Sequence, residues 1–216
     1  MKRFLTALQF LTIIRASKDP DITGEKLGKS MSCFPVVGLF IGLILVAVRI
    51  AFSYLLPSSL ADVLVIVVLV ILSGALHLDG FADTVDGLAG GRDREKTLAI
   101  MRDSQIGSFA VVGLILLLVL KVFALMEVPA EIKNAALLIM PVLGRWSTVH
   151  LASGYGYARS GSGTALAFTQ FAGKMEYIVS TLITAVILIG LFQIKGLMIM
   201  LIIAALTILF GHFFKR

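Results

Sequence analysis

Six long apolar stretches follow one another along the chain, separated by shorter polar segments. A helix needs about 20 mostly apolar residues to cross the hydrocarbon core of a bilayer, and each stretch is close to that length. The pattern predicts an all-α fold, a polytopic membrane bundle of about six transmembrane helices. The expected spans are roughly 34–56, 60–77, 106–126, 134–152, 177–194 and 196–214.

The first 14 residues, MKRFLTALQFLTII, are apolar at helical spacing but too short to span comfortably. Phe4, Leu5, Leu8 and Leu11 suggest a helix that lies in the membrane interface, within an N-terminal region of residues 1–33. A secretory signal is disfavoured, because the charged stretch from Arg15 follows without a small-residue cleavage site. We therefore expect one integral membrane domain over residues 1–216.

Composition supports a membrane protein. Hydrophobic residues make up 58% of the chain, whereas soluble domains are roughly 45–50% apolar. With 13 acids and 19 bases, the chain has too few charges to solvate a soluble globule of this size. The single cysteine, Cys33, excludes an intramolecular disulfide framework. The net charge of +6 does not indicate nucleic-acid binding, because the bases flank the apolar runs.

The positions of the bases predict the orientation. Fourteen of the Lys and Arg residues lie in the segments 1–33, 78–105, 153–176 and 215–216, which share one side of the six-span arrangement. The opposite side holds only Lys133 and Lys195. The positive-inside rule then places both termini and the segment 77–105 in the cytoplasm.

Three bases fall inside the expected spans. Arg49 and Lys121 lie near span ends, where we expect their charged heads to snorkel to the interface. Arg145 is in the middle of a span and is followed by a polar run at 146–150, so it is a candidate to face a polar cavity.

The segment 77–105 carries the concentrated chemistry. Asp79, Asp83 and Asp86 have i, i+4, i+7 spacing, which puts them within about 60° of one another on a continued helix. Like charges at this spacing repel, but a hard divalent cation such as Mg²⁺ or Mn²⁺ would turn the repulsion into binding. With Asp103 they form the candidate metal-binding and catalytic set.

Arginines follow the acids at once, with Arg92 and Arg102 as candidates for phosphate binding and Ser104 as a supporting donor. Carboxylates that hold a metal beside guanidinium groups suit a phosphorylated substrate. The pattern indicates phosphoryl or nucleotidyl transfer at the cytoplasmic membrane face. One of the four aspartates would be the general base towards an attacking hydroxyl.

The run D-T-V-D-G-L-A at 83–89 resembles the start of the metal motif of CDP-alcohol phosphotransferases, in which aspartates on neighbouring helices hold two metals. The Ala-Arg pair of that motif is displaced here, to Ala89 and Arg92, and the second half of the motif is not clearly present.

A resemblance over nearly the whole chain is more specific. The runs LTALQFLTII, FPVVGLFIG, HLDGFADTVDGLAGG and MRDSQIGSFA, with Tyr-Ala-Arg at 157–159, are similar to the adenosylcobinamide-GDP ribazoletransferase family, the cobalamin (5′-phosphate) synthases. The resemblance implies a membrane transferase that joins adenosylcobinamide-GDP to α-ribazole, or to its 5′-phosphate, and releases GMP with the help of Mg²⁺. Such an enzyme assembles the nucleotide loop in cobalamin biosynthesis.

Three further residues are candidates for contact with the substrate: His77, Arg145 and Arg159, the last in the Gly/Ser-rich segment ASGYGYARSGSGTA. The partners implied are the corrinoid nucleotide, α-ribazole and the lipid bilayer, and association with itself or with other enzymes of the corrinoid pathway stays open. The expected location is the cytoplasmic (inner) membrane of a prokaryote.

Members of the family usually continue with a Gly-Gly-x-Thr-Gly-Asp stretch. This sequence stops at GHFFKR and contains no Thr-Gly-Asp, so we expect it to lack the usual C-terminal segment. Two other functions compete with cobalamin synthesis. A CDP-alcohol phosphotransferase of phospholipid synthesis would use the same acids but release CMP. A cation transporter would favour acids buried in mid-span and inverted repeats, neither of which the sequence displays.

Overall fold

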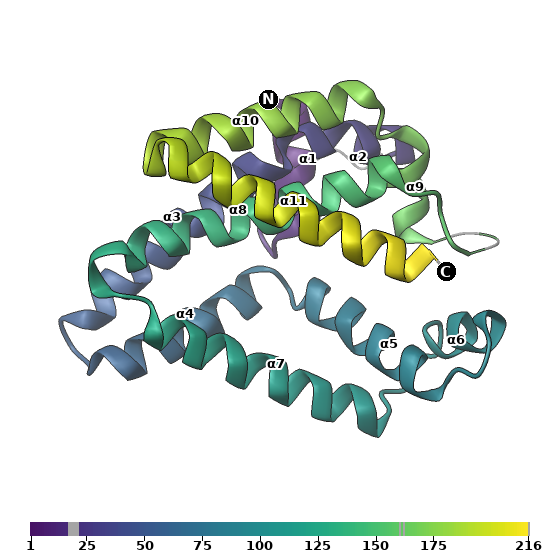
Figure 1. The fold of residues 1–216 in the computed structure, drawn as a ribbon, viewed down its shortest axis with the longest axis horizontal. Coiled ribbons are helices and arrows are strands. Elements are labelled where there is room, and N and C mark those ends of the chain that lie inside the picture. The colour runs from purple at the N-terminus through teal and green to yellow at the C-terminus, as the bar shows by residue number, and fades with distance from the viewer. Residues whose placement is uncertain (17–21, 160, 162, 216) are drawn as a thin grey trace. The chain divides into compact units, whose positions relative to one another are not determined.

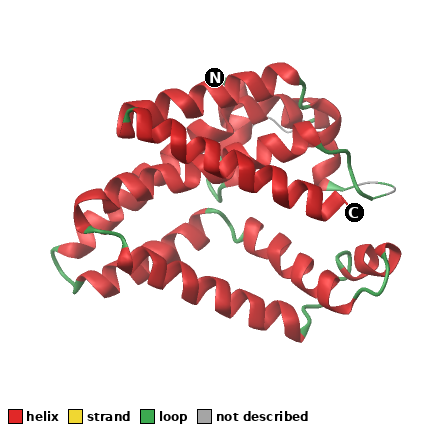
Figure 2. Ribbon diagram, viewed as in Figure 1, coloured by secondary structure: helices red, strands yellow, loops and turns green. Residues whose placement is uncertain are grey.

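The computed structural model describes residues 1–16, 22–159, 161 and 163–215, and in these residues it contains helices and no strand (Figure 2). The all-α prediction is confirmed. Most of the chain lies in helices, and many of them are apolar over much of their length. A helix makes its backbone hydrogen bonds within its own segment, as a bilayer requires.

The helices follow the chain in the order shown in Figure 1. Their bounds are α1 Lys2–Leu11, α2 Gly24–Ser30, the 3₁₀ helix η1 Met31–Cys33, α3 Phe34–Ser53, α4 Ser58–Leu72, α5 Leu76–Gly90, α6 Arg94–Ile100, α7 Ser108–Glu127, α8 Ala130–Gly154, α9 Thr164–Phe171, α10 Lys174–Phe192 and α11 Ile194–Lys215.

The chain divides into two compact units. The first contains residues 1–47 and 131–216, and the second contains residues 48–130. The second unit includes the end of α3, all of α4 to α7, and therefore all four candidate metal-binding aspartates.

Five stretches of helix in the described residues are long and apolar enough to cross a membrane. A sixth crossing results if the bent pair α4 and α5 counts as one span, in agreement with the expected number. The five stretches are Gly24–Ser53, Ser108–Glu127, Ala130–Gly154, Lys174–Phe192 and Ile194–Lys215.

The expected span at 60–77 is wrong in one respect, because it is not a continuous helix. α4 ends at Leu72, and α5 begins at Leu76 with its axis bent by 88°. Between the two helices, Gly74 and Ala75 both have left-handed backbone conformations, with φ of 58° and 54°. Glycine adopts that conformation freely, whereas alanine pays roughly 1–2 kcal/mol for it. The apolar pattern runs through this break, so hydropathy alone did not reveal it.

Within the second unit, α4 and α5 both pack against α7. Gly113 of α7 lies against Val85 and Phe81 of α5, and Gly107, just before α7, lies against Asp86. Rising residue numbers in α7 therefore meet falling numbers in α5, so the two helices are antiparallel. The N-terminal half of α7 is the support on which the acidic helix rests.

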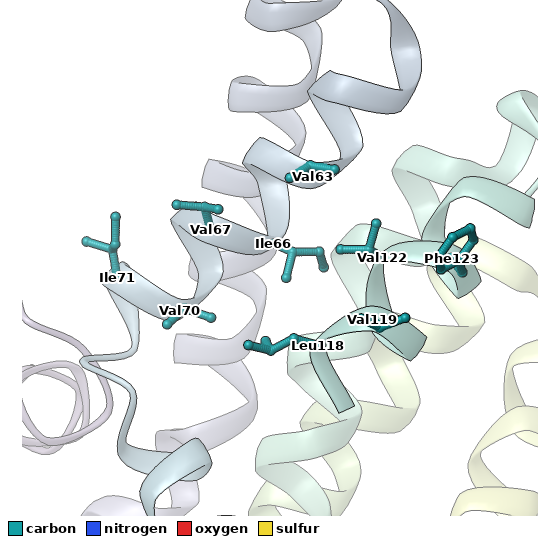
Figure 3. A pocket seen from close by; sticks show the side chains of 9 residues that line it. All are labelled: Val63, Ile66, Val67, Val70, Ile71, Leu118, Val119, Val122 and Phe123. Atoms are coloured by element: carbon teal, nitrogen blue, oxygen red, sulfur yellow. The ribbon is translucent and has the colours of Figure 1, made fainter. Parts of the chain in front are cut away.

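An apolar groove of about 410 Å³ lies between α4 and the other half of α7 (Figure 3). Only aliphatic and aromatic side chains line it, and several large apolar residues of α7 are exposed beside it. Such a surface is suited to lipid rather than to water. The lining residues are Val63, Ile66, Val67, Val70, Ile71, Leu118, Val119, Val122 and Phe123.

Arg49 forms an ion pair that the sequence reading missed. Its Nε lies 3.5 Å from Oδ1 of Asp62, which is 1% exposed at the start of α4. The expectation of simple snorkelling for Arg49 is therefore incomplete, since a buried carboxylate needs a charged partner of this kind.

In the first unit, α3 and α8 approach closely through glycines. A Cβ at Gly38 would lie 2.6 Å from the carbonyl oxygen of Pro141, and one at Gly42 would lie 2.8 Å from the Cα of Leu138. Small residues allow this contact between backbones, which is a common way to pack helices in membranes.

The N-terminal helix forms as expected and packs against α2 and η1. Ala7, Leu8 and Leu11 are buried, so one apolar face of α1 is covered by protein. Phe10 at the end of α1 lies in an aromatic cluster with Phe34 and Phe168, at ring distances of 4.8–6.3 Å. That α1 lies in the membrane interface stays a prediction.

Replacement of Gly38 tests the α3–α8 contact. We expect Gly38→Ala to lower the stability of the protein by about 1–3 kcal/mol, because the new methyl group would meet backbone that cannot rotate away. Gly144→Ala is the matched control on α8, where a Cβ would have no atom within 4 Å. Thermal unfolding in detergent should show a lower midpoint for Gly38→Ala only. Equal midpoints for the two variants would contradict the close contact.

Candidate functional site

A polar cleft of about 280 Å³ lies in the second unit, between α5 and the segment that links α6 to α7. It contains all four aspartates that the sequence singled out, together with a guanidinium and a hydroxyl group. The residues that line it are Asp79, Ala82, Asp83, Asp86, Met101, Arg102, Asp103, Ser104, Gln105 and Ile106.

One face of α5 supplies one wall. Asp79, Ala82, Asp83 and Asp86 follow the i, i+3, i+4, i+7 spacing that stacks side chains along a helix, and α5 is continuous from Leu76 to Gly90. Ala82 is buried, and its small side chain leaves the space between the acids open. Three carboxylates therefore face the same cleft.

A structured turn supplies the opposite wall. The short helix α6 is capped by Asp93, whose carboxylate accepts a hydrogen bond of 2.7 Å from the backbone N–H of Lys96. After α6, Oδ1 of Asp103 accepts a hydrogen bond of 3.0 Å from the backbone N–H of Gln105. This Asx-type turn brings Arg102, Asp103 and Ser104 to the cleft.

Asp86 has a second kind of contact. Its Oδ2 accepts a hydrogen bond of 2.6 Å from the N–H of Gly107, and its Oδ1 accepts one of 2.8 Å from the N–H of Ala110. Both donors belong to the first turn of α7, where the backbone N–H groups have no partner within the helix. Asp86 thus lines the cleft and also joins α5 to α7.

The donor set fits Mg²⁺ in one coordination mode. No three His, Cys, Asp or Glu side chains among the described residues stand close enough to hold one ion together. Mg²⁺, however, keeps several waters and is usually held by one or two carboxylates together with substrate phosphates. Hard carboxylate oxygens on both walls, beside Arg102, suit that mode.

The structure does not bring every candidate residue to this cleft. His77 and Arg92 belong to the same unit but do not line it. Arg145 and Arg159 belong to the first unit. Arg145 is 6% exposed within α8, and its Nε and Nη2 atoms make no hydrogen bond within the described residues.

Residue-type reasoning missed Met101, Gln105 and Ile106, which line the cleft without carrying an obvious catalytic group. All three lie within MRDSQIGSFA, the run on which the family resemblance partly rests. The signal was therefore the family resemblance of this run rather than the chemistry of its side chains.

Comparison with known proteins decides the family. The family described as Cobalamin-5-phosphate synthase matches residues 3–216, which is almost the whole chain. The chain belongs to the cobalamin-5-phosphate synthase family. The resemblance found in the sequence is thereby confirmed.

Individual members of the cobalamin-5-phosphate synthase family are similar over most of their length. The adenosylcobinamide-GDP ribazoletransferase of Geotalea daltonii is 42% identical over 88% of this chain and 78% of its own. Those of Fusobacterium nucleatum and Clostridium acetobutylicum are 37% and 32% identical, cover the whole of this chain, and are themselves covered to 86% and 85%. No solved structure matches the chain.

Proposed function

We propose that this protein joins adenosylcobinamide-GDP to α-ribazole, or to α-ribazole 5′-phosphate, in the nucleotide-loop step of cobalamin biosynthesis. The observation that carries the proposal is the cleft itself: in a chain of this family, four carboxylates, one guanidinium and one hydroxyl group line the same cleft. That combination suits the transfer of a substituted phosphate group.

The proposed reaction is a displacement at phosphorus. The ribazole hydroxyl oxygen forms a bond to the phosphorus attached to cobinamide, and the bond from that phosphorus to the oxygen of GMP breaks. The hydroxyl proton passes to one of the cleft carboxylates, which acts as general base. Atoms and charge balance with GMP as the leaving group.

Asp79, Asp83 and Asp103 are the candidate metal ligands, of which one or two would hold an ion together with substrate phosphates. Mg²⁺, or Mn²⁺ in its place, would neutralise developing charge on the phosphate oxygens. Arg102 would bind phosphate oxygens through two parallel hydrogen bonds, and Ser104 would donate another. Arg145, as a buried guanidinium, is a second candidate for an anionic group of the substrate. The roles of His77, Arg92 and Arg159 in substrate binding stay predictions.

Product analysis tests the reaction. Membranes that contain the protein receive Mg²⁺, adenosylcobinamide-GDP and α-ribazole, and the nucleotide released is identified. We expect GMP together with a cobalamin product, and neither when α-ribazole and its phosphate are omitted. Release of CMP from a CDP-alcohol, with no GMP from the corrinoid, would support the phospholipid-synthesis alternative instead.

Replacement of Asp83 tests the acidic wall. We expect Asp83→Asn, which keeps the volume but removes the charge, to lower turnover at least about 100-fold while the protein still folds. Glu95→Gln is the matched control, since Glu95 is an exposed acid of the same segment that does not line the cleft. Steady-state kinetics at saturating Mg²⁺ measures both. Turnover close to wild type in Asp83→Asn would remove it from the proposed ligand set.

Replacement of Arg102 tests the phosphate contact. Lysine keeps the charge but cannot grip phosphate through a planar fork, so we expect Arg102→Lys to weaken substrate binding or turnover at least about tenfold. The matched control is Arg94→Lys, at an exposed arginine of α6 that does not line the cleft. Unchanged KM and kcat in Arg102→Lys would leave Arg102 with only a role in membrane topology, which lysine serves equally well.

The orientation in the membrane is also a proposal, supported by the excess of bases on one side of the expected spans. It puts the termini and the cleft on the cytoplasmic side of the inner membrane. In a Cys33→Ser background, a cysteine at Glu95→Cys should react with an impermeant thiol reagent only from the cytoplasm. One at Ser58→Cys, at the first residue of α4, should react only from outside. Reaction of both from one side would contradict the six-span arrangement.

A further inference from the structure

Both carboxylate oxygens of Asp86 already have backbone donors. The residue that precedes α7, Gly107, has no side chain with which to cap the helix. The carboxylate of Asp86, 21 residues earlier in the chain, takes that place through the N–H groups of Gly107 and Ala110. It therefore acts as the N-cap of a helix to which it does not belong.

The contact is fitted closely. A Cβ at Gly107 would lie 2.7 and 2.8 Å from the two oxygens of Asp86 and 2.9 Å from its Cγ. The backbone of Gly107 has φ of −87° and ψ of 170°, which any residue adopts, so conformation does not require glycine here. Glycine is required because the carboxylate of Asp86 occupies the space that a Cβ would need.

Electrostatics favours the same arrangement. The N-terminus of a 20-residue helix such as α7 carries roughly half a positive charge, which stabilises a carboxylate placed beside it. A metal ion would compete with these two N–H groups for the same oxygens. Asp103, in comparison, accepts one backbone hydrogen bond, from within its own turn.

The two hydrogen bonds from Gly107 and Ala110 to Asp86, called the tether below, also position the opposite wall of the cleft. The segment from Met101 to Ile106 runs between the end of α6 and Gly107, so Asp86 holds one end of it against α5. Arg102, Asp103 and Ser104 lie in that segment and face Asp79 and Asp83. Fixing Gly107 thus fixes the distance between the two walls.

We propose that Asp86 is a positioning residue rather than a metal ligand, and that it holds the Arg102–Asp103–Ser104 turn over Asp79 and Asp83. The effect on turnover rests on the proposed function. The tether itself does not, since it consists of hydrogen bonds within the protein.

Amide hydrogen exchange and Mn²⁺ binding, measured on the full chain in detergent, separate the two roles. In Asp86→Asn, an amide group replaces one acceptor oxygen by a donor, so exchange at 107–110 should rise at least about tenfold. Its affinity for Mn²⁺ should stay within about threefold of wild type. In Asp83→Asn the pattern should reverse, with weaker Mn²⁺ binding and unchanged exchange.

Gly107→Ala gives a second route to the same loss, because its methyl group would displace the carboxylate while every aspartate remains. Gly80→Ala is the matched control on α5, where a Cβ would have no atom within 4 Å. We expect Gly107→Ala to raise amide exchange at 107–110 as Asp86→Asn does. The double variant Asp86→Asn/Gly107→Ala should exchange little faster than either single variant, because both substitutions remove the same contact. Gly80→Ala should leave exchange as in wild type.

Turnover per folded molecule extends the test to catalysis. With adenosylcobinamide-GDP and α-ribazole, Asp86→Asn and Gly107→Ala should lower kcat per folded molecule at least about tenfold, with the KM for Mg²⁺ unchanged. A mere loss of folded protein would leave the turnover of each folded molecule as in wild type. Unchanged exchange in Asp86→Asn together with weaker Mn²⁺ binding would overturn the proposal and make Asp86 a ligand. If the wild-type protein releases no GMP, the proposed function fails, while the exchange data still decide the tether.

Discussion

A carboxylate placed in hydrocarbon costs several kcal/mol, so a helix that carries three of them on one face cannot simply continue an apolar span. The second unit meets this constraint by breaking the helix. α4 is wholly apolar after Asp62, and the acids begin at Asp79, after the left-handed residues Gly74 and Ala75. At 15 residues, α4 is about 22 Å long, shorter than the roughly 30 Å of a hydrocarbon core. The 88° bend therefore separates a part suited to lipid from a part that carries chemistry.

Because the span is broken, α5 does not continue the helix of α4, and it packs against α7 instead. Gly113 lets α5 approach closely along one side, and Asp86 closes the contact at the end of the helix with two backbone hydrogen bonds. The same contact anchors the turn that carries Arg102 and Asp103. Rigid positioning of this kind matters for phosphate transfer, since most of the catalytic effect comes from placing charges before the reaction begins.

The sequence was sufficient for the features that depend on composition and periodicity. Apolar length predicted the helices, and the i, i+4, i+7 spacing predicted that Asp79, Asp83 and Asp86 would share a face, because both follow from the regular geometry of a helix. The bend between α4 and α5 was missed, since Ser-Gly-Ala interrupts neither the hydropathy nor the apparent length of the span. The hydrogen bonds of Asp86 to Gly107 and Ala110, and the pairing of Arg49 with Asp62, were missed for a different reason. Each joins separate helices, and a single sequence contains no record of such contacts.

The charges of the cleft also limit what it can hold. Asp86 is partly offset by the N-terminus of α7, which leaves Asp79, Asp83 and Asp103 against the single guanidinium of Arg102. That balance is about two negative charges, the amount that one divalent cation neutralises. A pyrophosphate substrate would add further negative charge, so it needs either a second cation or another base. Carboxylates on two facing walls, with Arg102 beside them, allow a phosphate to enter together with its own Mg²⁺, which is how phosphorylated substrates commonly bring this ion to a protein.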